Sequence, residues 1–248
     1  LLWVLLGAGQ IVLAWVFLQT VERFSALKAD ERMASLTLEL SLNLVGIAAV
    51  VALLAAPLIA MRMLSGEFRD GSFDLTGSSP VTLGAVVLGK FLGVVALVTP
   101  LCLLPAVNLL LLAGGAQLDP GLIAAATLGL WLAALLFSAV GLYASSLSAQ
   151  PGAAVLAAFG ILLLLSVVGQ AQALGVAPGL SLFGWLTWNE HLFWFLLGAV
   201  RLSDVGYFVL FTLLGMAAPS LKALLIGMIA LIVSLLIAIA NFVRAEHR

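Results

Sequence analysis

Charged side chains are scarce in this sequence: 8% of its 248 residues are Asp, Glu, Lys or Arg, against about 25% in an ordinary soluble domain. Apolar residues make up 64% of the chain, and the mean hydropathy is +1.28. This composition excludes a soluble enzyme, so any ATP hydrolysis must reside in another chain. The 10 Lys and Arg residues are thinly spread and the net charge is -1, which leaves no basic face for nucleic acid.

Cysteine and histidine are also nearly absent. Cys102 is the single cysteine, so neither an internal disulfide nor a thiolate metal centre can form. The two histidines, His191 and His247, have no acids or cysteines at ligand spacing, so we expect no metal site and interpret His191 as a residue of the membrane interface. The serines have no histidine base at a recognisable motif spacing, so we expect no catalytic residue.

Long uncharged apolar stretches dominate what is present. A helix rises about 1.5 Å per residue and the hydrocarbon core is about 30 Å thick, so roughly 20 apolar residues cross it once. The expected crossings are residues 1–21, 40–61, 91–118, 122–144, 153–172 and 223–243, with a shorter stretch at 205–218. The fold class is therefore an all-α polytopic membrane helix bundle, and six or seven crossings both fit.

Three further features modify this pattern. Pro100 and Pro105 are expected to kink the third crossing. Residues 185–200 combine several aromatic side chains with Glu190 and His191, a mixture typical of a helix at the membrane interface. The chain starts on Leu1, directly in a span, and we infer that an N-terminal piece precedes it.

Amide side chains occur inside the expected spans. A polar group in hydrocarbon must find a partner or line a watery path, so these amides either bond between helices or contact a substrate. The amides are Gln10, Asn43, Asn108, Gln170 and Gln172, of which the last four are candidates for a substrate path. Because no expected span has a buried acid or base, an ion-coupled carrier lacks its usual charged group.

The connection at residues 62–90 carries the most specific signal. Its acids Glu67, Asp70 and Asp74 recur at three- and four-residue spacing, so on a helix they share one face. Phe68 and Phe73 could fill a groove on a partner protein. From periodicity alone, a docking helix and a solvated loop remain equally open.

The order of motifs in this region resembles a known family. The run Glu67-Phe68-Arg69-Asp70-Gly71-Ser72-Phe73-Asp74-Leu75, then Ser79-Pro80, then Val87-Leu88-Gly89-Lys90-Phe91-Leu92-Gly93 is similar to the signature of ABC type-2 permeases, in particular their gliding-motility-like branch. Residues 141–147, residues 189–193, Gly198 and residues 204–208 also resemble that family. The likeness departs at residues 148–150, where relatives usually carry a basic residue.

This resemblance implies a transmembrane permease subunit of an ATP-binding-cassette exporter in a bacterial inner membrane, with no cofactor of its own. Its partners would be a second permease copy or homologue and two cytoplasmic ATPase subunits, which hold ATP and Mg. Residues 62–90 would be cytoplasmic and residues 22–39 outside. The family's coupling helix, which contacts the ATPase, falls on Gly66, Glu67, Phe68, Arg69, Asp70, Gly71, Ser72, Phe73, Asp74 and Leu75.

The family's last span begins at the position of Asp204. We therefore expect a permease domain at residues 1–221, and an additional helix with its tail at residues 222–248. That helix would end outside the cell, where some relatives are fused to an extracytoplasmic partner; a re-entrant 205–218 would instead leave the C-terminus inside. The alternative function is a non-transporting membrane scaffold that anchors an extracytoplasmic complex.

Overall fold

The computed structural model describes residues 2–26, 35–70, 83–112, 114, 118–148, 150–173 and 186–217. Their regular elements are α1 (Leu2–Ala26), α2 (Leu36–Leu40), the π-helical turn η2 (Ser41–Val45), α3 (Gly46–Asp70), α5 (Leu83–Leu110), α6 (Pro120–Leu147), α7 (Pro151–Ala173), α9 (Trp188–Leu196) and α10 (Leu202–Ala217). These described ranges contain helices and no strand. The all-α polytopic bundle is thereby confirmed.

Four of these helices are long and apolar enough to cross a membrane: Trp3–Ala26, Leu36–Met61, Gly84–Leu110 and Pro120–Leu147. They correspond to the first four expected crossings. The third differs in its bounds, because α5 begins at Leu83 and ends at Leu110, whereas the expected span began after Lys90. A span drawn from uncharged residues alone begins after Lys90, whereas α5 includes this lysine because its ammonium has a polar partner.

Local signals explain where the central helix α6 begins. The Asp119 carboxylate accepts hydrogen bonds from the backbone N–H groups of Gly121 (2.9 Å) and Leu122 (3.3 Å). Pro120 follows at the first helical position, where its missing N–H has no intrahelical partner to lose. The helix therefore starts at a cap that the sequence specifies.

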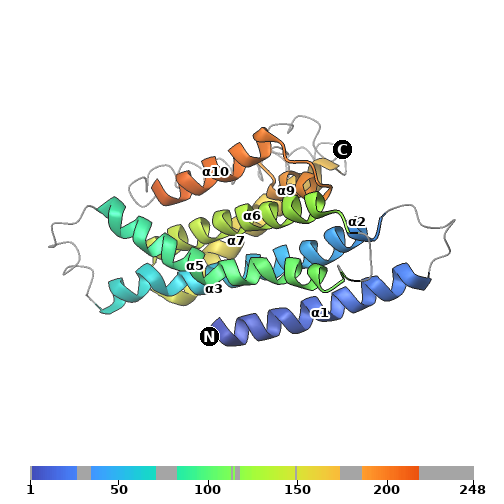
Figure 1. Ribbon diagram of the computed structural model, residues 1–248. Coiled ribbons are helices and arrows are strands. Elements are labelled where there is room, and N and C mark those ends of the chain that lie inside the picture. The colour runs from blue at the N-terminus through green and yellow to red at the C-terminus, as the bar shows by residue number, and fades with distance from the viewer. Residues whose placement is uncertain are drawn as a thin grey trace, which may run out of the picture.

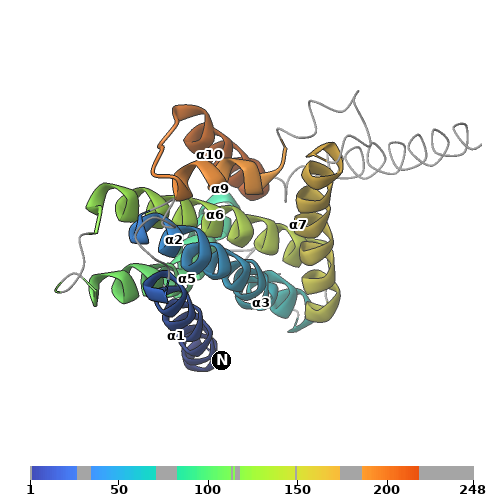
Figure 2. The same cartoon turned by 90° about the vertical axis from the view of Figure 1, so that its right-hand side faces the viewer.

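The long helices lie side by side along the length of the bundle, and α7 crosses them steeply (Figures 1 and 2). Helix α6 is central, since α3, α5, α7, α9 and α10 all pack against it. By contrast, α1 is peripheral: its Trp3 side chain is 83% exposed and its Trp15 side chain 65% exposed. In Figure 1 the end of α3 and the start of α5 both lie at the left end of the bundle.

Two glycines allow close packing on α6. A methyl group built at Gly141 would lie 2.9 Å from Cα of Pro57, so the two backbones of α6 and α3 nearly touch there. A methyl group at Gly129 would lie 2.4 Å from Cβ of Phe195 in α9. Any side chain larger than the hydrogen of glycine at these positions would force the helices apart.

Helix α10 runs in the same direction as α6. Gly198, just before α10, lies against Leu122, and Gly215 near its end lies against Ala139. Leu122 and Ala139 are separated by about 26 Å at about 1.5 Å per residue, so α10 follows α6 through most of the bundle. The expected crossing at residues 223–243, the tail and the boundary at residue 221 lie outside the described residues.

Candidate functional site

The predicted coupling segment begins on a helix that continues out of the apolar span. The apolar part of the second span ends at Met61, but α3 continues to Asp70. At about 1.5 Å per residue, α3 therefore extends about 14 Å past Met61. The backbone of residues 66–70 is helical, whereas residues 71–75 and the side chains of residues 64–70 lie outside what the structure describes.

The base of this extension is fastened by two neighbouring helices. Ser145 Oγ of α6 donates a hydrogen bond to the Met61 carbonyl oxygen at 2.8 Å. Lys90 Nζ of α5 donates to the Met63 carbonyl oxygen. The Lys90 ammonium is thus satisfied by a backbone acceptor on α3, which explains why the apolar helix α5 tolerates it.

Apolar side chains fill the space around this point. Val87 and Phe91 of α5 pack with Ala139 and Leu142 of α6, and Met63 of α3 contacts the group. Met216, from the end of α10, packs there too. Four helices therefore meet beside the base of the predicted coupling segment.

The amide candidates for a substrate path occupy different settings. Asn108 is 3% exposed, and its Oδ1 accepts a hydrogen bond from Gln10 Nε2 at 2.9 Å, which joins α5 to α1. Asn43 is exposed, and its Nδ2 donates to the Glu39 carbonyl oxygen at 2.9 Å one turn earlier. Gln170 and Gln172 belong to α7, but their side chains are not described.

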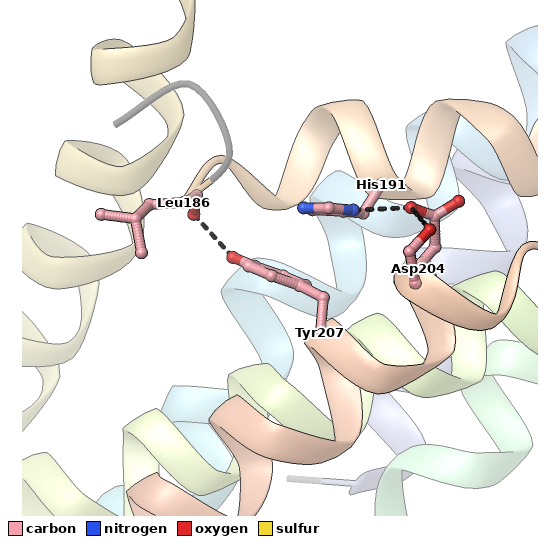
Figure 3. Close-up of polar contacts among 5 residues, drawn as sticks. Leu186, His191, Asp204 and Tyr207 are labelled. Atoms are coloured by element: carbon pink, nitrogen blue, oxygen red, sulfur yellow. Dashed lines mark hydrogen bonds and ion pairs between the residues drawn. The ribbon is translucent and has the colours of Figure 1, made fainter. Parts of the chain in front are cut away.

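A buried polar cluster at the start of α10 was not predicted from the sequence (Figure 3). His191 of α9 is 5% exposed and Asp204 of α10 is 3% exposed, and His191 Nδ1 lies 2.7 Å from Asp204 Oδ1. The His191 ring stacks on Tyr207 with centroids 4.0 Å apart, and the Tyr207 hydroxyl donates to the Leu186 carbonyl oxygen at 2.6 Å. The sequence did not predict that His191 is buried and paired, and its position at the membrane interface stays a prediction.

The pairing of His191 with Asp204 depends on the turn between α9 and α10. Gly198 has a φ of +83°, a conformation that L-amino acids rarely adopt. This glycine lets the chain reverse between the two helices. The reversal brings Asp204 to His191 across thirteen residues of sequence. In the sequence, the only indication of this pairing is that Gly198 lies between His191 and Asp204, and this is a weak signal.

An apolar groove of about 550 Å³ lies between α5 and α6. Its polar side chains are already engaged: Trp131 Nε1 donates to Thr99 Oγ1 at 3.1 Å, and Thr127 Oγ1 donates to the Ile123 carbonyl oxygen at 2.8 Å. The groove therefore offers an apolar surface with little capacity for polar recognition. Within the described ranges, no cluster of histidine, cysteine or acidic side chains could hold a metal ion.

Together, the helices and their composition define a multi-pass membrane protein whose second span continues into a fastened helical extension. The chain belongs to the ABC-2 transporter family: the family described as "ABC-2 family transporter protein" matches residues 1–247. It is thus a membrane permease subunit of an ABC transporter, a component that is not itself catalytic, and the family implies ABC ATPase subunits as partners. Comparison with curated proteins and with solved structures finds no match.

Proposed function

We propose that this permease couples ATP hydrolysis by a separate cytoplasmic ATPase to export, or to other work outside the cell, and that residues 66–75 form its coupling helix. The observation that supports this most strongly is the extension of α3 past the apolar span to Asp70. A helix is stiff and all its backbone groups are paired internally, so it can carry force beyond the membrane. A flexible connection at this point would absorb the movement instead.

The residue types in the segment suit a docking contact. Acidic and basic side chains alternate with Phe68 and Phe73, so the segment offers charges that fix orientation and aromatic groups that fill a pocket. The motif also favours the gliding-motility-like branch of the family. On this proposal two ATPase subunits, which bind ATP and Mg, act on this chain and on a second permease copy, and an extracytoplasmic partner can complete the assembly.

Charge reversal tests the contact with the ATPase. We expect Glu67→Lys and Asp74→Lys to release the ATPase from the detergent-solubilised complex, because each places a like charge against the surface that the acid meets. Glu22→Lys is the matched control, since Glu22 is an exposed acid at the end of α1, on the expected outer side. Co-purification of the ATPase with each variant measures the effect.

Full recovery of the ATPase with both reversed variants would remove the coupling assignment. The rival function, a scaffold that anchors an extracytoplasmic complex, is tested by ATP hydrolysis in liposomes. A scaffold leaves the ATPase rate independent of this chain, whereas a coupled permease changes it.

A further inference from the structure

The base of α3 is held within a short stretch by three separate contacts. The Cα of Pro57 meets the backbone of α6 at Gly141, the Met61 carbonyl oxygen accepts from Ser145, and the Met63 carbonyl oxygen accepts from Lys90. Pro57 and Met61 belong to the last part of the apolar span and Met63 follows it, so all three contacts precede the predicted coupling segment. The extension of α3 is therefore attached to the bundle where it leaves the apolar span.

The attachment to α6 is the tightest of the three. Ser145 is 0% exposed, and its hydroxyl bonds in a setting of low dielectric, where losing a partner is costly. At Gly141 the contact atoms are backbone and Ala60 Cβ, at 2.9 and 3.0 Å from where a methyl would lie, so neither side can yield by rotating a side chain. A hydrogen bond and a backbone contact four residues apart prevent α6 from sliding along α3.

Helix α6 then leads to the opposite end of the bundle. Its Gly129 packs against Phe195 of α9, and its Leu122 packs against Gly198 before α10. Both contacts are close, and the buried His191–Asp204 pair joins α9 to α10 beside them. A movement of α6 would therefore also move α9 and α10.

We infer that Ser145 and Gly141 are positioning residues for energy coupling, which lock α6 to the base of α3 so that a displacement of residues 66–75 moves α6. The inference rests on the function proposed above. Ser145 acts through the Met61 carbonyl group and Gly141 through the backbone at Pro57. Lys90 adds a support from α5.

The test compares two buried hydroxyl groups on the same helix. Ser145→Ala removes the bond from α6 to α3, whereas Ser138→Ala removes a bond to the Ala134 carbonyl oxygen within α6 itself (2.7 Å). Nitroxide labels on Trp3→Cys and Leu147→Cys report the distance between α1 and α6, since both side chains are exposed. A Cys102→Ala background removes the chain's own cysteine.

The distance is measured by double electron–electron resonance in the complex with the ATPase, before and after trapping with ATP and vanadate. We expect the unmodified complex and Ser138→Ala to show the same nucleotide-dependent change. Ser145→Ala should retain the ATPase but show less than half of that change. If Ser145 had only a structural role, Ser145→Ala would lower thermal stability, but the complex that remains folded would hydrolyse ATP and show the full distance change.

Gly141→Ala provides an independent variant, because its methyl group would push α6 off Pro57, and Gly160→Ala in α7 is its control, with open space at that position. A full distance change in Ser145→Ala and Gly141→Ala overturns the inference. So does an unmodified complex that hydrolyses ATP without moving α6. Failure of the proposed function differs from both, since the ATPase would then be recovered in full with Glu67→Lys and Asp74→Lys, or would hydrolyse ATP at a rate independent of this chain.

Discussion

Single residues on α6 set how closely its neighbours approach. We predict that Gly129→Ala lowers the stability of the protein by about 1–3 kcal/mol, the usual range for an added methyl group in a packed core. The added carbon would lie 2.4 Å from Cβ and 2.6 Å from Cγ of Phe195, so the whole ring must shift. Thermal unfolding in detergent measures the change.

Gly160→Ala serves as the control for that measurement. It places the same methyl group on a helix with nothing within 4 Å. Alanine has the higher helix propensity by about 1 kcal/mol, so this variant should unfold at the same temperature or a higher one. An equal loss of stability in both variants would show that Phe195 does not determine the effect.

The His191–Asp204 pair is the second feature at this scale. We predict that Asp204→Ala destabilises the protein by about 1–3 kcal/mol, the cost of removing one member of a buried hydrogen-bonded pair. Ser203→Ala changes the neighbouring exposed hydroxyl, which lies 3.5 Å from the same carboxylate, and should have little effect. Thermal unfolding of the two variants checks this, and a comparable shift in both would contradict it.

This pair also shows why part of the molecule could not be predicted from sequence. The first four crossings could be predicted, because their length and lack of charge are local properties of the chain. The burial of Asp204 depends on the left-handed backbone of Gly198 and on stacking between His191 and Tyr207, which are properties of the folded chain. Hydropathy counts each residue without its partner, so it could not pair His191 with Asp204.

At the scale of elements, the second span illustrates the same limit. Residues 40–61 were predicted from their lack of charge, but the helical backbone runs without interruption from Leu36 to Asp70. Arg62, Glu67 and Arg69 have good helix propensity, and this local preference carries the helix past the apolar core. The family resemblance predicts the coupling helix at residues 66–75, whereas the roles proposed for Ser145 and Gly141 required the position of α6.

Lys90 links two elements, and its removal should loosen the end of α3. We predict that Lys90→Met, which keeps the apolar stem but loses the ammonium group, raises amide hydrogen exchange in residues 61–70 about tenfold. A hydrogen bond to a charged group contributes about 1.5–3 kcal/mol, and 1.4 kcal/mol corresponds to a factor of about ten. Mass spectrometry of exchanged peptides gives the measurement.

The control for this experiment is a peptide from the centre of α6. Exchange in that peptide should stay unchanged in Lys90→Met. Uniformly faster exchange would indicate general destabilisation, and unchanged exchange at residues 61–70 would show that the ammonium does not support α3.

At the scale of the whole molecule, the expected orientation follows from the coupling segment. If residues 62–90 are cytoplasmic, α5 carries the chain outward from Leu83 to Leu110 and α6 returns it inward from Pro120 to Leu147. Gly114 then lies outside the cell, and Gln150 lies in the cytoplasm. Both positions are exposed, and Cys102 is buried and should not react.

We predict that a membrane-impermeant maleimide applied to intact cells, with access to the inner membrane, labels Gly114→Cys and leaves Gln150→Cys unlabelled. Permeabilised cells should label both variants, which shows that each thiol is reactive, and the unmodified protein should stay unlabelled because of the burial of Cys102. Labelling of Gln150→Cys alone in intact cells would show that the protein has the opposite orientation in the membrane. That result would place the extension of α3 on the side without ATP, where it could not transmit work from a cytoplasmic ATPase.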